Sequence, residues 1–249
     1  MKFRLIDSGS NTGSMNMAID ESLLSSKLPV LRFYHWKPAT LSLGYFQDTN
    51  KINKHHCKKN KIHIVRRLTG GNAVLHDKEL TYSFIIDEKH MPKGTIESYG
   101  EICAGLMRGL ELLGLEPEVN LEVKKQHKTA VCFHDPSYYE VLVKKRKIIG
   151  SAQKRHKGKL LQHGSILLDM DHDKYAGCFH NFSSNSLRDR VTTINNELEK
   201  KVNYDKVKKA MINGFKEAMD IDFIQSKLTF DETKQAEKLR SKYESNGFR

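Results

Sequence analysis

The chain has 249 residues, which is enough for one large domain or for one domain with a small appendage. Its 42 Lys and Arg residues outnumber its 30 Asp and Glu residues, which gives a formal net charge of +12, and 38% of its residues are hydrophobic. This composition excludes a wholly disordered chain, and no apolar run reaches the roughly 20 residues of a membrane span. Asp7 interrupts the first apolar residues and leaves no secretory signal, so we expect a cytoplasmic protein without a membrane partner.

The positive charge fits an acidic protein partner as well as it fits nucleic acid. The basic residues form short groups without interleaved aromatic residues that could stack on bases, and the chain has no nucleic-acid-binding motif. Its cysteines lie far apart, without a CxxC pair or the ligand spacing of a zinc site; they are Cys57, Cys103, Cys132 and Cys178. We therefore expect no metal site and no disulfide framework.

The first half of the chain predicts one helix followed by several strands. Residues Met15 to Ser26 have amphipathic helical spacing, and Ser14 precedes them as a capping residue. Apolar and aromatic runs, separated by Pro38 and Gly44, then predict strands over 30–36, 40–46, 61–67 and 80–87.

The second half predicts two longer helices and a hairpin. Residues 98–113 place Ile102, Leu106 and Leu110 on one face, and Gly114 ends this helix. Helical periodicity returns from about residue 200. Short strands at 139–143 and 147–150 flank the basic turn 144–146 and predict the hairpin, and another short strand is expected at 164–169.

Together these elements predict an α+β fold, with a mixed β-sheet and flanking helices. We expect one domain over residues 1–224. The charged residues 225–249 are expected to form a C-terminal helix that packs loosely, or a mobile tail.

The densest polar segment runs from Arg66 to Asp77, leaves one strand, turns at Gly70 and Gly71 and returns toward another strand. Adjacent glycines permit positive φ and close approach of the main chain to a bound group. Arg66 and Arg67 offer cationic forks for a carboxylate or a phosphate. The alternative is a hairpin with a solvated basic edge, because the segment does not follow the phosphate-loop pattern.

Cys132 is the preferred nucleophile among the four cysteines. It precedes a His-Asp-Pro turn outside any periodic element, whereas Cys103 lies on the predicted helix and Cys178 lies among aromatic residues. Cationic surroundings lower the pKa of a thiol and make it reactive, and exposure in a basic loop keeps Cys57 as a second candidate. His134 is two residues beyond Cys132, but proximity in sequence alone does not establish a catalytic pair.

Lys147 leads into an apolar pair and a Gly-Ser-Ala run, which is unlike a solvated run of charge. If its side chain points inward, its ammonium group can hold a carboxylate, a phosphate or a thiolate. The alternative is an exposed hairpin lysine such as Lys144 or Lys145. For His163, at the start of the next predicted strand, a capping or packing role is expected.

In this order, these segments resemble the biotin/lipoate A/B protein ligase superfamily, and most of all its octanoyl-[acyl-carrier-protein]:protein N-octanoyltransferases. The resemblance covers about residues 3 to 220. The matching stretches are MNMAIDE (15–21), RFYHWKPATLSLGYFQ (32–47), RRLTGGNAVLHDKELTYS (66–83), VCF with PSYYE (131–140) and KIIGSAQKRHKGKLLQHGSILLD (147–169).

The resemblance implies the biotin/lipoate protein ligase catalytic-domain fold and a role for each matched residue. Cys132 would be the nucleophile that becomes an acyl-thioester, and Lys147 would lower the pKa of this thiol and hold the acyl carbonyl. The residues that would bind the substrate and wall the acyl tunnel are Arg67, Gly70, Gly71, His76 and Ser151.

The implied reaction moves octanoyl from octanoyl-acyl carrier protein to a lysine of the glycine cleavage H protein or of another lipoyl domain, with no cofactor and no nucleic acid. One alternative is an amidotransferase that moves octanoyl or lipoyl from H protein to E2 lipoyl domains. Another is an ATP-dependent lipoate-protein ligase, which needs no cysteine. A non-catalytic basic binding protein on the same scaffold is a further hypothesis, against which the intact Cys132 and Lys147 argue.

Overall fold

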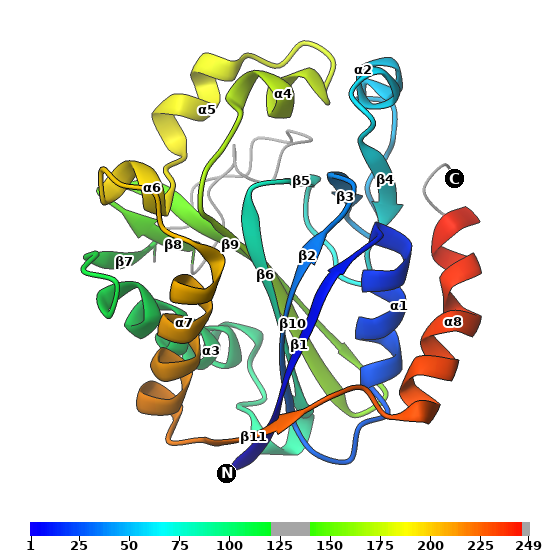
Figure 1. Cartoon of the computed structure of the whole chain (residues 1–249), viewed down its shortest axis with the longest axis vertical. Coiled ribbons are helices and arrows are strands. Elements are labelled where there is room, and N and C mark those ends of the chain that lie inside the picture. The colour runs from blue at the N-terminus through cyan, green and yellow to red at the C-terminus, as the bar shows by residue number, and fades with distance from the viewer. Residues whose placement is uncertain (121–139, 246–249) are drawn as a thin grey trace.

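A computed structural model describes residues 1–120 and 140–245, which form two sheets with helices around them (Figure 1). The described strands of the large sheet follow the order β11-β1-β2-β6-β10-β9-β8-β7. Their bounds are β1 (Lys2–Asn11), β2 (Val30–Trp36), β6 (Glu79–Asp87), β7 (Pro117–Asn120), β8 (Glu140–Val143), β9 (Arg146–His156), β10 (Lys159–Leu167) and β11 (Asp222–Ser226). The small sheet has the order β4-β3-β5, with β3 (Thr40–Leu43), β4 (His63–Arg66) and β5 (Val74–His76).

Helical segments surround both sheets. They are α1 (Gly13–Leu23), α2 (Lys54–Lys59), the 3-10 turn η1 (Glu88–His90), α3 (Thr95–Glu111), α4 (His172–Gly177), α5 (Ser184–Arg190), α6 (Ile194–Glu197), α7 (Tyr204–Met219) and α8 (Phe230–Ser245). Among the residues that the structure describes, no helix is both long enough and apolar enough to cross a membrane.

The large sheet is mixed, which confirms the predicted fold class. β1 runs parallel to β2 and to β11, whereas β6 pairs antiparallel with β2 and β10, and β10 pairs antiparallel with β9. Side chains alternate between the two faces of a strand, so Phe84 and Ile85 belong to separate apolar clusters. Each face of the sheet therefore needs its own cover of helices.

One face is covered by α3 and α7 (Figure 1). Phe215 of α7 stacks on Phe84 of β6 with 5.8 Å between ring centroids, and Leu106 and Leu110 of α3 are fully buried in the same cluster. The apolar periodicity of the sequence predicts both helices and their inward faces correctly.

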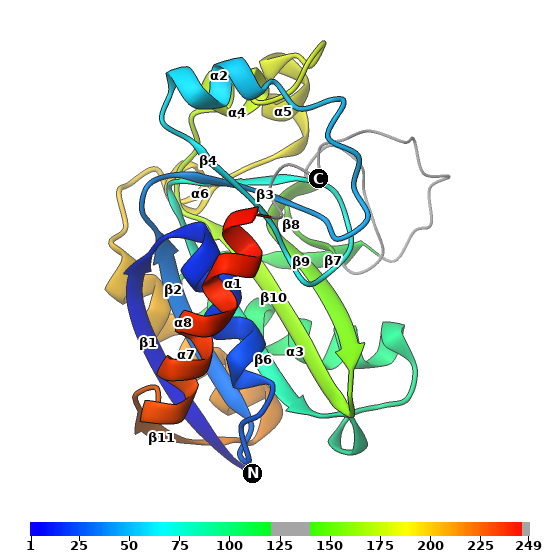
Figure 2. The same cartoon turned by 90° about the vertical axis from the view of Figure 1, so that its right-hand side faces the viewer.

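The other face is covered by α1, and α8 packs on the outside of α1 (Figures 1 and 2). The N-cap of α1 is Thr12, whose hydroxyl accepts from the backbone N–H of Met15, so the predicted cap at Ser14 is wrong by two residues. The charged stretch expected as a loose helix or tail forms α8. Ala236 and Tyr243 of α8 are buried against α1, although most of the helix surface is charged.

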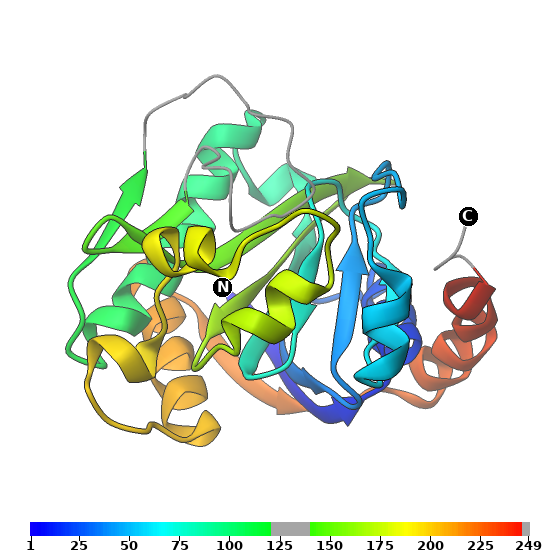
Figure 3. The same cartoon turned by 90° about the horizontal axis from the view of Figure 1, so that it is seen from above.

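The small sheet lies at one end of the large sheet, together with α2, α4 and α5 (Figures 1 and 3). Its strands share an apolar cluster with these helices, in which Leu41 and Leu75 pack with Tyr175, Phe179 and Leu187. This arrangement places the small sheet across the end of β2, β6, β9 and β10.

Several strands differ from the predicted ones. The predicted hairpin of 139–143 with 147–150 is confirmed, because β8 pairs antiparallel with β9. β9 and β10 are longer than the strands predicted at 147–150 and 164–169, and the turn between them uses Lys157 and Gly158 at φ values of 51° and 76°. Basic residues on β9 interrupt the apolar pattern there and hide its length. β3 ends at Leu43 rather than at residue 46, and β1, β5, β7 and β11 were not predicted.

Candidate active site

A cavity lies where the small sheet meets the large sheet and α1. It encloses about 370 Å³ of empty space, part of which is open to solvent. The residues that line it are Met17, Tyr34, Trp36, Ser42, Arg67, Val74, His76, Thr81, Gly150, Ser151, Ala152, His163, Gly164 and Ser165. Three residues predicted to bind substrate are therefore brought together here from two parts of the chain: Arg67 and His76 from the segment 66–77, and Ser151 from β9.

Part of the wall is apolar. Trp36 stacks on His76 with 4.1 Å between ring centroids and an interplanar angle of 16°, and Met17 and Val74 add aliphatic surface. The indole N–H of Trp36 donates to Thr81 Oγ1 at 2.6 Å. This bond fixes the orientation of the indole ring, which stacks on His76 in the cavity wall.

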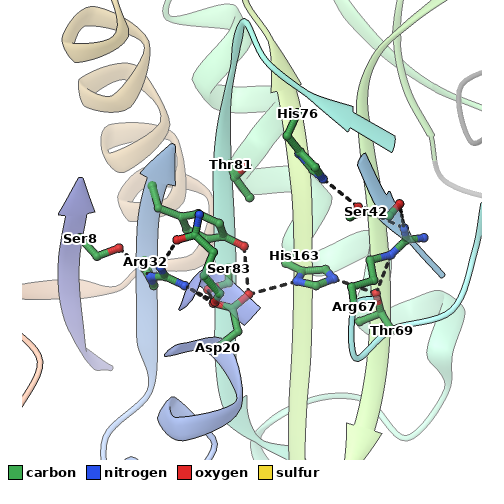
Figure 4. Close-up of polar contacts among 12 residues, drawn as sticks. Ser8, Asp20, Arg32, Ser42, Arg67, Thr69, His76, Thr81, Ser83 and His163 are labelled. Carbon is green, nitrogen blue, oxygen red and sulfur yellow. Dashed lines mark hydrogen bonds and ion pairs between the residues drawn. The ribbon is translucent and has the colours of Figure 1, made fainter. Parts of the chain in front are cut away.

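A buried carboxylate, Asp20 of α1, connects α1 to the large sheet behind this cavity (Figure 4). Its oxygens accept from Arg32 at 2.6 Å, from Tyr34 at 3.0 Å and from Ser83 at 2.8 Å. Burial raises the pKa of Asp20, but the Arg32 charge and the bonds from His163 and Ser83 outweigh this and hold the pKa below its ordinary value. Asp20 is therefore an anion that can only accept.

His163 continues this network across the cavity wall (Figure 4). Its Nδ1 lies 3.1 Å from Asp20 and its Nε2 lies 2.7 Å from Thr69 Oγ1. Because Asp20 can only accept, Nδ1 carries the hydrogen and Nε2 accepts from Thr69. Burial lowers the pKa of His163, despite the opposing effect of Asp20. The ring is thus held neutral in one orientation, which is more than the predicted capping or packing role.

Arg67 determines the shape of the double-glycine loop. Its guanidinium donates to the carbonyl oxygens of Gly70 at 2.5 Å, Asn72 at 2.9 Å and Ser42 at 3.0 Å, and to Thr69 Oγ1 at 3.1 Å. The expectation that this group is a fork for an anionic ligand is therefore not supported, because its donors contact the loop and β3.

Gly70 and Gly71 do not line the cavity, although they were predicted to wall it. Gly71 adopts a φ of 85°, which favours glycine. A Cβ at Gly44 would lie 1.8 Å from the carbonyl oxygen of Gly71. The main-chain segments at Gly44 and Gly71 therefore approach too closely for a side chain at Gly44. The glycines therefore hold the loop against the end of β3 and act on the cavity through Arg67.

Lys147 is buried in β9, which rules out the exposed hairpin lysine as an alternative. Its Nζ lies 2.5 Å from Glu140 Oε1, and the two side chains are 4% and 3% exposed. The neighbouring Lys144 side chain is 75% exposed. Lys147 does not line the cavity, but three residues later β9 reaches Gly150, which does. The buried ammonium group and its carboxylate partner thus belong to β9 and β8, outside the residues that line the cavity.

The hydroxyl of Ser151 forms a hydrogen bond with the hydroxyl of Tyr82, a residue of the adjoining core. Ser151 Oγ and Tyr82 OH are 2.8 Å apart, and Gln162 donates to the same tyrosine oxygen at 2.9 Å. Gly164 lies between Ser151 and Tyr82 in the sheet, and a Cβ there would lie 2.5 Å from Ser151 Oγ. The side chain that was expected to bind substrate therefore helps to shape the wall.

Cys132, the predicted nucleophile, lies outside the described residues. The competing candidate Cys57 is not an exposed thiol, because it is buried in α2, where it contacts Cys178. Cys103 is buried in α3, which raises the pKa of its thiol. Of the thiols in the described part, none has the exposed cationic setting of a reactive cysteine.

Sequence reasoning missed several polar residues of the site, including Asp20, Thr69, Ser42 and Glu140. Ser42 Oγ lies 2.8 Å from His76 Nε2. In the described ranges, His76 Nδ1, Glu79 Oε2 and Ser165 Oγ are buried without a hydrogen-bond partner. Of these, His76 and Ser165 line the cavity, where a bound group can meet them. No group of three or more His, Cys, Asp or Glu side chains suited to a metal ion occurs among the residues described.

Comparisons with known proteins show the family to which the sequence belongs. Residues 12–216 match the model of the lipoyl protein ligase A/B catalytic domain. The chain is 43% identical to the octanoyltransferase LipM of Bacillus subtilis, over 92% of this chain and 91% of that protein, and 41% identical to the octanoyltransferase LipM of Geobacillus kaustophilus, over 98% and 96%.

Solved structures give the same result for the fold. A lipoate-protein ligase A crystallised with bound ATP superposes with a TM-score of 0.84 at 27% identity, covering 99% of this chain and 97% of the other. A bipartite lipoate protein ligase from Thermoplasma acidophilum, studied with its E2 lipoyl domain, also has a TM-score of 0.84, at 26% identity over 99% and 94%. The chain belongs to the lipoyl protein ligase A/B catalytic-domain family.

Proposed function

We propose that this chain is an octanoyltransferase of protein lipoylation. It moves octanoyl from octanoyl-acyl carrier protein to a lysine of the glycine cleavage H protein or of another lipoyl domain. The observation that carries the proposal is the 43% identity to an octanoyltransferase over nearly the whole of both chains. The cavity between the sheets supports it, because an acyl chain needs a partly apolar enclosed site.

Trp36, Met17 and Val74 offer apolar surface to the octanoyl chain. Each buried methylene of such a chain contributes about 0.8 kcal/mol. The hydroxyl of Ser165, which has no internal hydrogen-bond partner, then faces the more polar end of the bound group. Polar groups without internal partners are suited to orient a ligand in an otherwise apolar pocket.

Cys132 is proposed as the nucleophile and Lys147 as the cation beside it. The Cys132 thiolate attacks the carbonyl carbon of the donor thioester, the new C–S bond forms, and the phosphopantetheine sulfur leaves and takes up a proton. The neutral amine of the acceptor lysine then attacks the carbonyl carbon of the acyl-enzyme, an amide C–N bond forms, the C–S bond to Cys132 breaks, and the proton lost by the amine passes to the departing sulfur. The ammonium of Lys147 favours the thiolate and the oxyanion of both steps.

Glu140 supports the assignment of Lys147. A lysine buried without a partner would lose its proton readily, because burial disfavours the charged form. The carboxylate 2.5 Å away favours the charged form and fixes the position of Nζ. The pair therefore keeps a buried cation on β9, three residues before Gly150 of the cavity lining.

Two alternatives share this scaffold. An amidotransferase would take octanoyl or lipoyl from H protein and pass it to E2 lipoyl domains, also through a cysteine. The superposition on a ligase with bound ATP favours, as the second alternative, an ATP-dependent lipoate-protein ligase. These reactions differ in the donor, so the donor is the quantity to test.

The test offers three donors separately: octanoyl-acyl carrier protein, octanoylated H protein with an E2 domain, and octanoate with ATP. We expect octanoyl-H protein to form from the first donor without ATP, and to be absent with Cys132→Ser. Acylation that requires ATP and persists in Cys132→Ala would instead establish a ligase. Transfer from octanoylated H protein alone would establish an amidotransferase.

A further inference from the structure

Phe46 is the most exposed large apolar side chain in the part of the chain that the structure describes. Its ring is 90% accessible, and Tyr45 beside it is 46% accessible. The two rings contact edge to face, with 4.8 Å between centroids. Burying a phenylalanine side chain is favourable, so an aromatic pair that stays in solvent gives up this stabilisation in the isolated chain.

The loop that carries Phe46 is held firmly. Arg66 Nη1 donates to the carbonyl oxygens of Gly44 and Gln47, each at 2.8 Å, and the N–H of Tyr45 donates to Thr69 O at 2.9 Å. The side chain of Gln47 accepts from the N–H of Gly44 at 3.1 Å. Phe46 is therefore presented on a preorganised turn, and a partner that covers it does not have to order the loop first.

This turn adjoins the cavity. It begins two residues after Ser42, which lines the cavity, and Gly44 abuts Gly71 of the double-glycine loop. The bond from Tyr45 to Thr69 joins it to the residue that holds His163. A protein bound at Phe46 is thus bound next to the proposed reaction centre.

Basic residues lie close to this aromatic pair in space or in sequence. Lys154 Nζ lies 4.5 Å from the ring centroid of Tyr45. Residues 51–67 contain no acidic side chain, and their basic residues are Lys51, Lys54, Lys58, Lys59, Lys61, Arg66 and Arg67. The nearby acid Asp48 is bonded to Asn50. The exposed aromatic pair with basic residues nearby is complementary to an acidic domain that has an apolar patch on its surface.

We propose that Phe46 anchors the docking of the acidic domain that carries the acceptor lysine. This inference rests on the proposed function, because it concerns the second half-reaction. The acceptor amine sits on a four-carbon stem, so the acceptor domain has to contact the enzyme beside the cavity. The donor thioester hangs on a longer phosphopantetheine arm, which lets its carrier protein dock farther away.

The test compares the affinity of H protein for the wild type, Phe46→Ala and Phe230→Ala in an equilibrium titration. Phe230 is a matched control, because it is 80% exposed and begins α8, which starts beside β11 at the opposite end of the molecule (Figure 2). We expect Phe46→Ala to weaken binding by about tenfold or more, the size of an interface hot spot, and Phe230→Ala to bind like the wild type.

A kinetic experiment assigns the half-reaction. The acyl-enzyme is formed first and then mixed with increasing H protein. We expect Phe46→Ala to raise the half-saturating H protein concentration by about tenfold, with an unchanged limiting rate and an unchanged rate of acyl release to hydroxylamine.

Three outcomes would overturn the inference: equal affinity of all three proteins, no binding of H protein to the wild type, or a defect confined to acylation by octanoyl-acyl carrier protein, which would assign Phe46 to the donor. Failure of the wild type to become acylated by any donor would refute the proposed function instead. The titration still decides the docking surface in that case, because it requires no chemistry.

Discussion

Asp20 and His163 are separated by 143 residues in sequence and joined by one hydrogen bond. Arg32, Tyr34 and Ser83 share the same carboxylate, so α1, β2, β6 and β10 meet at a single buried anion. Removing one member of such a network leaves its partners buried without compensation. The described part of the chain thus has buried charges at the Asp20 network and at the Lys147–Glu140 pair, and both can be tested by substitution.

The first prediction concerns the dependence of stability on pH. The pKa of His163 in the folded chain lies below 6.5, so the unfolded chain binds this proton more readily and stability falls as the pH drops below 6.5. The folded pKa of Asp20 is also depressed, and its stabilisation is lost as the pH falls below about 3.8. Urea unfolding of the wild type and His163→Gln from pH 7.5 to 4 should show a difference that shrinks toward low pH. A difference that is constant with pH would contradict this account of His163.

The second prediction is a double-mutant cycle at Lys147 and Glu140. Glu140→Leu or Lys147→Met each removes the ion-pair partner of a buried charge, and each should cost about 3–5 kcal/mol of unfolding free energy. The double variant replaces both charges by apolar groups and should cost much less than the sum of the two. Denaturant titrations of the four proteins measure this coupling. Additive losses would mean that the two groups do not stabilise each other.

At the scale of elements, the turn after β3 and the double-glycine loop are built against each other. The segment from Arg66 to His76 was singled out in the sequence because of its arginines and glycines, and Arg67 and His76 do line the cavity. The bonds from Arg67 to the carbonyls of Gly70 and Asn72 could not be predicted, because any loop carbonyl is an equally good acceptor until the loop conformation is known. The sequence pattern thus located the segment. It predicted an anionic ligand for Arg67, whereas the guanidinium donates to carbonyl oxygens of its own loop.

The third prediction compares two glycines of these loops. Gly44→Ala places a Cβ 1.8 Å from the carbonyl oxygen of Gly71, so the main chain must shift. We expect a loss of about 1–3 kcal/mol, the usual cost of overpacking, together with reduced acyl transfer. Gly70→Ala is the control, since no heavy atom lies within 4 Å of its added Cβ. Thermal unfolding and transfer rates measure both; equal behaviour of the two variants would contradict the close approach described here.

The strands of the large sheet mark where sequence pattern stops being informative. β2 and β6 consist mainly of apolar and aromatic residues and were predicted almost residue for residue, because both faces of these strands are buried. β9 crosses from the buried Ile148 and Ile149 to a polar end with Lys154 and Arg155, so only its apolar half was recognised. The Asp20 network was missed for the same physical reason: its members are polar and become buried only when α1 packs on the sheet.

At the scale of the whole molecule, α8 ties the C-terminal part of the chain to the first strand and the first helix. Glu232 binds Arg4 of β1, and Tyr243 OH donates to Glu21 of α1 at 2.5 Å. Glu21 is adjacent to Asp20, so α8 supports the helix that supplies the buried anion of the site. The charged sequence here predicts a loosely packed helix or a mobile tail, and the structure has a helix. Its packing depends on a few buried residues, which are enough even though the rest of the helix is polar.

The fourth prediction is that the chain depends on α8. Ending the chain at residue 229 exposes the surface of α1 that Ala236 and Tyr243 cover, and removes the partner of Arg4. We expect a lower unfolding temperature and weaker acyl transfer, with Phe230→Ala unchanged as the control for loss of an exposed apolar residue. Wild-type stability in the shortened chain would show that residues 1–229 fold independently of α8.

The measurement that tests the central claim most directly is intact mass spectrometry of the wild type and Cys132→Ser after mixing with octanoyl-acyl carrier protein, without ATP. The account predicts that the wild type gains the mass of one octanoyl group, that hydroxylamine removes it, and that the serine variant gains no hydroxylamine-labile group. An unmodified wild type, or a gain in mass that is the same in Cys132→Ser, would contradict transfer through a thioester on Cys132.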